Sequence, residues 1–216
     1  AEPRRSSTEV SRMIKLQDAR IADGLPRVVA EQPWAKVLSA VYGELQGRML
    51  EYMFLIFVTP VGPYFKGGFA ATPYVITRKY DRAAPLGTGI YKIGGNYAAS
   101  LRASHEAHAA GYSAEFYLDA KEKKYIDECG AANFFGIKDN TYITPLSTSI
   151  LPSITNKSLM QLAEDMGMKV ERRPVAEEEL TTFEEAGACG TAAVISPIER
   201  IDDPENGHSY VIAKDG

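Results

Sequence analysis

Apolar residues recur at helical spacing in the first fifty positions and form short β-favouring runs after them. A capping-box pattern at Ser6–Glu9 predicts a helix over about residues 8–23. A second helix is predicted over residues 33–49, and we interpret its apolar side as core-facing. That side carries Trp34, Leu38, Val41, Tyr42, Leu45 and Met49. The continuous apolar run Tyr52–Val58 predicts a buried strand.

After a Pro- and Gly-rich loop, helices and strands alternate irregularly along the chain. Helices are predicted over residues 96–110, 155–166 (with Thr155 as N-cap and Gly167 as stop) and 177–185. Strands are predicted at residues 74–79, 113–118, 124–126, 133–137, 141–144, 169–173, 192–196 and 209–213, with hairpin turns at 119–123 and 139–140. This mixture favours an α/β or α+β fold with mostly antiparallel sheet and flanking helices, and argues against a doubly wound parallel sheet.

Composition and charge exclude several classes of protein. The chain has 216 residues, 45% of them hydrophobic, and a net charge of −4, so no basic field would attract nucleic acid. The run Met53–Val58 is too short to span a bilayer, and the first residues lack the apolar core of a secretory signal. Cys129 and Cys189 form no metal or redox motif, and His105 and His108 lack a third ligand. We therefore expect a cytoplasmic protein without a metal site.

The candidate chemistry centres on Lys92, which lies in the glycine-rich segment Gly87–Tyr97. A lone lysine is usually solvated, but Ile90 and Ile93 indicate a buried strand end, where desolvation would lower its pKa. The glycines around it would let a bulky ligand approach the backbone. Lysine, tyrosine and glutamate suit an aldehyde cofactor that carries a phenol oxygen and a pyridine nitrogen.

The tyrosine and the carboxylate of that set each have an ordinary alternative. Tyr97 could be a core aromatic whose hydroxyl lies at the rim. Glu128 could be an exposed charge, but the following segment to Phe135 is almost uncharged, so a partly buried carboxylate there needs a partner. Asp127 is the neighbouring candidate, and it would point the opposite way if the segment is extended.

Several blocks in one order carry a resemblance to a known family. They are Thr59–Phe65, Lys92–Tyr97, Asp127–Asn133, Ile150–Thr155 and Gly190–Ala193. With them, residues 52–213 resemble the larger domain of a branched-chain-amino-acid aminotransferase, a pyridoxal 5′-phosphate (PLP) enzyme of fold type IV. The resemblance implies three parts: a reduced N-terminal small domain over residues 1–58, an interdomain loop over 59–68, and a PLP-binding large domain over 69–216.

The resemblance also implies roles for individual residues. Lys92 would form the Schiff base and move the substrate proton, Tyr97 would hold the phenolate, and Glu128 would hold the protonated pyridine nitrogen. The remaining cofactor contacts would come from Leu151, Ile154, Thr155, Thr191 and Arg5, mostly toward the phosphate. Tyr64 would cover the substrate side chain, and the amides of Ala192 and Ala193 would receive the substrate carboxylate.

The implied activity is transamination of leucine, isoleucine or valine with 2-oxoglutarate, carried out by a homodimer or larger homo-oligomer. Two alternatives share the fold: a D-amino-acid aminotransferase and an aminodeoxychorismate-lyase-like enzyme. A third alternative is a catalytically silent PLP-binding or assembly fragment, because the family's Tyr-x-Arg-Pro segment has no match in residues 1–50.

Overall fold

The computed structural model describes residues 70–192 and 194–212. All of them lie in the second of the two units into which the chain divides, Pro63–Gly216. The helices predicted over residues 8–23 and 33–49, the strand Tyr52–Val58 and the loop 59–68 lie outside the described residues. Arg5, Tyr64 and Ala193 lie outside them as well.

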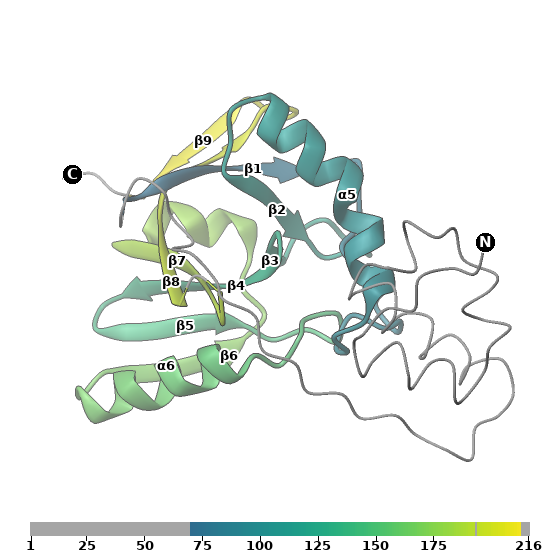
Figure 1. The fold of residues 1–216 in the computed structure, drawn as a ribbon. Helices are drawn as coiled ribbons and strands as arrows, with labels where there is room; N and C mark the ends of the chain where they lie inside the picture. Colours follow the sequence, from purple (N-terminus) through teal and green to yellow (C-terminus); the bar gives the residue numbers. More distant parts are fainter. Residues whose placement is uncertain (1–69, 193, 213–216) are drawn as a thin grey trace, which may run out of the picture. The chain divides into compact units, whose positions relative to one another are not determined.

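The described residues form a mixed sheet, two α-helices and one 3₁₀ helix (Figure 1). The helices are α5 (Gly94–Ala109), α6 (Ile154–Asp165) and the 3₁₀ helix η1 (Glu177–Thr182). The strands are β1 (Thr72–Thr77), β2 (Ala114–Leu118), β3 (Ile126–Cys129), β4 (Ala132–Lys138), β5 (Thr141–Pro145), β6 (Lys169–Arg173), β7 (Glu185–Gly190), β8 (Val194–Asp203) and β9 (His208–Val211).

The sheet runs in the order β3-β2-β1-β8-β7-β4-β5-β6, and β9 pairs with β8. Because β3 also pairs with β4, six of these strands close into a ring. Closure pairs the strand edges that an open sheet would leave free. Most pairings are antiparallel, whereas β1–β2, β1–β8 and β5–β6 are parallel. The predicted mixed sheet with flanking helices is confirmed.

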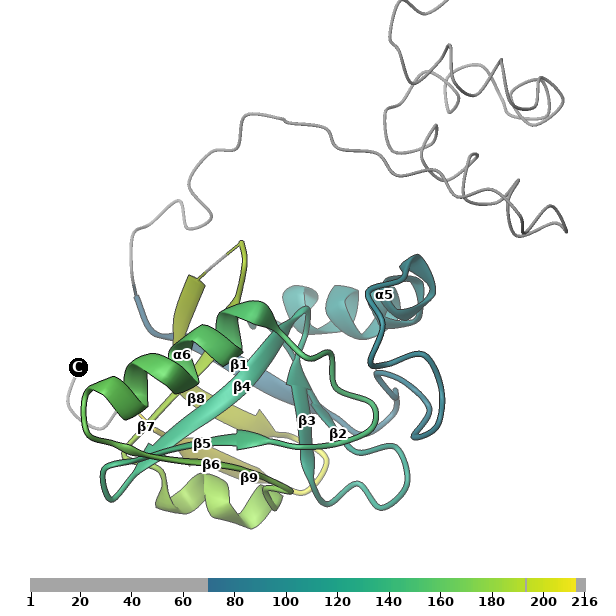
Figure 2. The ribbon, with the colours of Figure 1, turned by 90° about the horizontal axis from the view of Figure 1, so that it is seen from below.

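Each α-helix connects two neighbouring parallel strands. Helix α5 joins β1 to β2 and lies beside them, and α6 joins β5 to β6 and lies beside β6 (Figures 1 and 2). Parallel neighbours need such a crossover, because a tight turn cannot connect them. The buried residues of α5 are the small side chains of Ala103 and Ala107, which allow the helix to pack closely.

The core consists of two apolar clusters separated by the sheet. Phe134 belongs to the larger one, with Phe116 and Phe183 as edge-on ring neighbours. Phe135, the next residue of β4, belongs to the smaller one and stacks on Tyr142. Successive side chains of a strand point to opposite faces, so β4 contributes to both clusters. Strand β4 is therefore fixed by packing on both of its faces.

Two predicted elements differ from the structure. The acidic segment predicted as a helix over residues 177–185 is a short 3₁₀ helix that ends at Thr182, and Glu185 begins strand β7. Strand β7 was not predicted, and the late strand expected from Ala192 begins at Val194. A 3₁₀ helix has poorer hydrogen-bond geometry than an α-helix and usually forms short segments, which fits its early end here.

A buried ion cluster ties η1 to β1 and β8. The guanidinium of Arg78 donates to Glu177 at 2.6 Å and to Asp203 at 2.7 Å. These carboxylates and His208 lie close enough to hold a metal ion, but Arg78 already pairs with both carboxylates. We interpret the cluster as structural. Within residues 70–192 and 194–212, no helix is long and apolar enough to cross a bilayer.

Candidate active site

Lys92 and Tyr97 are brought together where the chain enters helix α5. Ile93 is extended and α5 begins at Gly94, so Lys92 precedes the first turn and Tyr97 lies within it. The Lys92 amine donates a 2.7 Å hydrogen bond to the Tyr97 hydroxyl. This contact joins the two groups that the sequence analysis assigned to one cofactor.

The predicted burial of Lys92 at a strand end is wrong. Lys92, Ile90 and Ile93 are all exposed in the described residues, and the segment leads into a helix. The Asn96 side chain fixes this segment, because its amide donates to the carbonyls of Thr88 (2.9 Å) and Tyr91 (2.8 Å). The lysine is thus positioned by backbone contacts, and its amine stays accessible to a ligand.

The glycines around Lys92 serve different purposes. A Cβ on Gly94 or Gly95 would meet no heavy atom within 4 Å, so open space lies beside the lysine. A Cβ on Gly89 would collide with the backbone of Ser149. Ligand access, predicted for all the glycines, therefore fits Gly94 and Gly95, whereas Gly89 allows two backbone segments to approach each other.

Glu128 is a buried carboxylate with three partners. It is 3% exposed, and one oxygen accepts from the Leu151 amide (2.8 Å) and the Asn133 side chain (3.2 Å). Its other oxygen pairs with the Arg82 guanidinium. Burial raises the pKa of Glu128 to about 7, while the charge of Arg82 and the Leu151 amide oppose the rise.

Arg82 is the functional residue that sequence reasoning missed. It lies after β1 and is 9% exposed, and its guanidinium also donates to the carbonyls of Gly89 (3.1 Å) and Ser149. The signal available in the sequence was indirect. A buried Glu128 needs a cation, and Arg82 is the charge that precedes the uncharged run Ala83–Tyr91.

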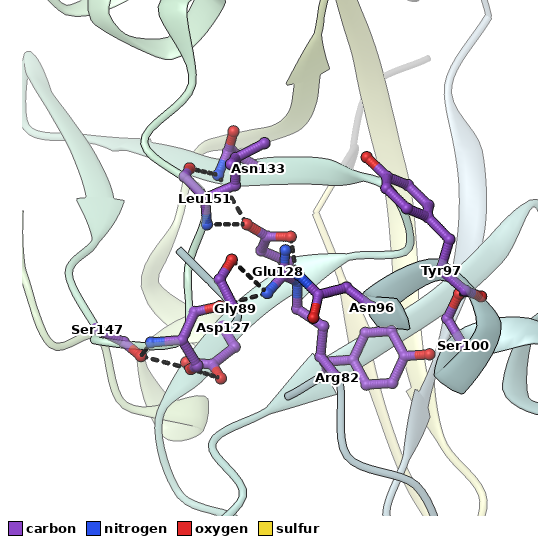
Figure 3. Close-up of polar contacts among 12 residues, drawn as sticks. Arg82, Gly89, Asn96, Tyr97, Ser100, Asp127, Glu128, Asn133, Ser147 and Leu151 are labelled. Atoms are coloured by element: carbon purple, nitrogen blue, oxygen red, sulfur yellow. Dashed lines mark hydrogen bonds and ion pairs between the residues drawn. The ribbon is translucent and has the colours of Figure 1, made fainter. Parts of the chain in front are cut away.

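Asp127 and Glu128 have separate partners, as the extended segment predicted. Asp127 is 1% exposed and accepts a 2.5 Å hydrogen bond from the Ser149 hydroxyl. In Figure 3, Asp127 lies toward Ser147, and Glu128 lies toward Leu151 and Asn133. Burial raises the pKa of Asp127, and hydrogen bonds from serine hydroxyls oppose the rise.

A small hollow of about 20 Å³ lies between Tyr97 and Glu128. Tyr97 and Glu128 both line it, so α5 and β3 contribute to one site. The other lining residues are Arg82, Asn96, Ser100, Gly130, Ala131, Asn133 and Leu151. The hollow is about the size of one water molecule. Its lining residues Asn96, Tyr97 and Ser100 come from the same helix as Gly94 and Gly95, where a Cβ would meet open space.

The start of helix α6 supplies backbone amides near this hollow. Ser153, and not the predicted Thr155, is the N-cap, because its hydroxyl accepts from the Asn156 amide at 3.2 Å. Thr155 lies inside the helix instead. The amides of Ile154 and Thr155 belong to the first turn, where no intrahelical acceptor exists, and they form an anion-binding arrangement. Leu151 links this end to Glu128 through its own amide.

Thr191 and Ala192 follow strand β7 in an exposed turn. Strand pairing places this turn at the hollow's end of the sheet, because Cys189 of β7 pairs with Asn133, which lines the hollow. The structure joins Lys92 to Tyr97 and Glu128 to Leu151 by hydrogen bonds, and Tyr97, Glu128 and Leu151 line the same hollow. Ile154, Thr155, Thr191 and Ala192 lie on neighbouring loops, and no contact joins them to Lys92 in the described residues.

Comparison with known proteins identifies the family of the chain. The family described as Amino-transferase class IV matches residues 15–201. The chain belongs to this family. A branched-chain-amino-acid aminotransferase of Helicobacter pylori is 53% identical over 163 residues, which cover 74% of this chain and 48% of that protein. The chain spans about half the length of the curated relatives it matches.

Solved structures of family members share the fold of the described residues. A branched-chain amino acid aminotransferase of Escherichia coli aligns with a TM-score of 0.61 and 32% identity, covering 67% of this chain and 48% of that one. The Thermobaculum terrenum enzyme in its PLP form aligns with a TM-score of 0.58 and 31% identity, covering 62% of this chain and 44% of that one. The type-IV aminotransferase fold predicted from the sequence blocks is therefore confirmed.

Proposed function

We propose that this chain catalyses PLP-dependent transamination of leucine, isoleucine and valine, with 2-oxoglutarate as the amino-group acceptor. The observation that carries the proposal is the Lys92–Tyr97 hydrogen bond beside the buried carboxylate of Glu128. A reactive amine, a phenol and a desolvated carboxylate are the three groups that a pyridoxal ring requires from a protein. The Helicobacter pylori relative is named as a branched-chain-amino-acid aminotransferase.

The residues present fit PLP at each of its polar ends. Glu128 has both oxygens partnered, but an ionised carboxylate can accept about four hydrogen bonds, so it retains capacity for the ring nitrogen. The amides of Ile154 and Thr155, with the hydroxyl of Thr191, would hold the phosphate. A ring is too large for the hollow alone, so it would occupy the open space beside Gly94 and Gly95. Arg5 is proposed as a further phosphate contact.

The chain's own groups have distinct tasks in this proposal. The bound cofactor supplies an electron sink for the substrate carbanion. Lys92 would hold the cofactor, and its free amine would take the proton from the substrate Cα. Tyr97 keeps the lysine amine oriented through its hydroxyl. The Ala192 and Ala193 amides bind the substrate carboxylate, and Tyr64 covers the substrate side chain.

Product analysis distinguishes this activity from its same-fold alternatives. With PLP supplied, we expect the full 216-residue chain to form a visible cofactor band and to convert L-leucine and 2-oxoglutarate into 4-methyl-2-oxopentanoate and glutamate. D-Alanine and aminodeoxychorismate are run in parallel. Turnover of either one in preference to L-leucine would identify the D-amino-acid or lyase alternative. A band without any keto acid would identify the silent PLP-binding fragment, and failure to take up PLP would reject the proposal.

We also propose that the protein acts in the cytoplasm as a homodimer. Exposed apolar residues cluster before and within α5, including Leu86 (94% exposed), Tyr91 (59%) and Leu101 (67%), and such a surface commonly marks an interface. Light scattering on the full chain is expected to give twice the mass of one chain. A monomer that retains full activity would contradict the proposed assembly.

A further inference from the structure

Arg82 contacts three separate parts of the site at once. Its Nε pairs with Glu128 on β3, and its Nη1 donates to the carbonyl of Gly89 in the segment that carries Lys92. The same nitrogen donates to the carbonyl of Ser149 in the segment that leads to α6. Arginine alone among the side chains presents several fixed donors in one plane, which this arrangement uses.

Gly89 lies close against the backbone of Ser149, so the two segments that Arg82 contacts are tightly packed. A Cβ on Gly89 would overlap the Ser149 backbone, so these two segments lie against each other and share the Arg82 guanidinium. The buried Arg82 therefore fixes the lysine segment relative to the start of α6. Loss of its donors would leave two backbone carbonyls with unsatisfied acceptors in a desolvated place.

Burial has the largest effect on the ionisation of Glu128, and Arg82 is the strongest of the charges that act on it. Burial disfavours the carboxylate, and Asp127 on the same strand adds a like charge. Arg82 is the cation that opposes both. The other titratable groups that face Glu128 or Arg82 from packed elements are Tyr117 on β2, Cys129 on β3 and Cys189 on β7. Tyr97 on α5 lines the same hollow.

We propose that Arg82 is a positioning residue of this site, which keeps Glu128 ionised and holds the Lys92 segment and the α6 entry around it. The inference rests on the proposed function and deepens it. A carboxylate and a ring nitrogen in contact share one proton, and a cation on the carboxylate side favours placing that proton on the nitrogen. Arg82 thereby sets the charge of the ring from a distance without touching it.

The first test uses the cofactor-free full chain. The Glu128 carboxyl is titrated by ¹³C NMR in the wild type, Arg82→Met and Arg82→Lys. We expect the Glu128 pKa to rise by roughly one unit or more in Arg82→Met, because the opposing cation is lost. Arg82→Lys keeps the charge without the forked donors, so the Glu128 pKa in this variant should lie between those of the wild type and Arg82→Met. Arg200→Gln, which removes an arginine paired with Asp202 on β8, should leave the titration unchanged.

The second test uses the chain loaded with PLP. We expect Arg82→Met to slow the half-reaction with L-leucine roughly tenfold, corresponding to loss of one charge-assisted contact. Arg82→Lys should recover part of the rate, and Arg200→Gln should match the wild type. In a Glu128→Gln background, Arg82→Met should slow the half-reaction by a clearly smaller factor than in the wild-type background, because the two residues act through one interaction.

These tests separate the inference from the proposed function. If the chain takes up no PLP, the function fails, while the carboxyl titration still decides the role of Arg82. An unchanged Glu128 pKa in Arg82→Met, with the fold intact by circular dichroism, would overturn the inference. Equal rate losses in Arg82→Met with and without Glu128 would also overturn it. If Arg82→Met does not fold, Arg82→Lys provides the same comparison.

Discussion

Lys92→Ala is expected to abolish transamination, with a loss of roughly 10³-fold or more. The substitution removes both the covalent attachment and the proton carrier, and a positioned acid–base group alone contributes roughly 10²–10⁴-fold. Lys92 is exposed, so truncation opens no cavity and the fold should persist. The measurement is the visible absorbance of PLP-treated protein before and after borohydride, followed by the half-reaction with L-leucine.

Two matched variants sharpen this experiment. Lys121→Ala removes an exposed lysine in the turn between β2 and β3 and should retain both the band and the rate. Tyr97→Phe removes the hydroxyl that accepts from Lys92 at 2.7 Å and should keep the cofactor attached at a reduced rate. If borohydride still fixes the cofactor to Lys92→Ala, another lysine carries it and the site must be reassigned.

Local turn chemistry made several parts of the fold predictable. Asp139 and Asn140 were predicted to close a hairpin, and both have positive φ (48° and 54°) between β4 and β5. Gly167 was predicted to stop a helix, and it follows α6 with φ 82°. Both signals depend on backbone conformations that only certain residues adopt easily, so neighbours far along the chain do not alter them.

The elements that could not be predicted from the sequence depend on tertiary contacts. Strand β7 contains Ala186, Gly187, Ala188 and Gly190, which have little intrinsic preference for strands. It forms a strand because β4 and β8 pair with it on both sides. Gly187 is required there, since a Cβ would come within 2.6 Å of the Phe135 ring. No local pattern could reveal that requirement.

In the candidate site, too, local signals were predictable and tertiary contacts were not. The chemical identities of Lys92, Tyr97 and Glu128 were readable from neighbouring residues, and the first two do form a hydrogen bond. The prediction that Lys92 is buried was wrong, because the isoleucines that flank it precede a helix and stay exposed. Arg82 was missed because its partner lies 46 positions away in sequence (128 − 82 = 46), and only the folded chain brings them together.

Glu128→Gln is expected to slow transamination roughly ten- to hundredfold while the cofactor stays bound. Loss of one charge-assisted hydrogen bond costs ~1.5–3 kcal/mol, and each 1.36 kcal/mol in the barrier is about tenfold in rate. Glutamine keeps the shape and can still contact Leu151 and Asn133, so the backbone should hold. The rate is measured by stopped-flow mixing with L-leucine at matched PLP occupancy.

Asp127→Asn is the matched control, because it changes an adjacent and equally buried carboxylate. Asp127 is bonded to Ser149 and lies away from the hollow that Glu128 and Tyr97 line, so its loss should change the rate far less. Asparagine can still accept from the Ser149 hydroxyl, which limits any structural effect. If the aspartate change proves the damaging one, the ring nitrogen belongs to Asp127. The role proposed for Arg82 would then fail with it, because Arg82 pairs with Glu128.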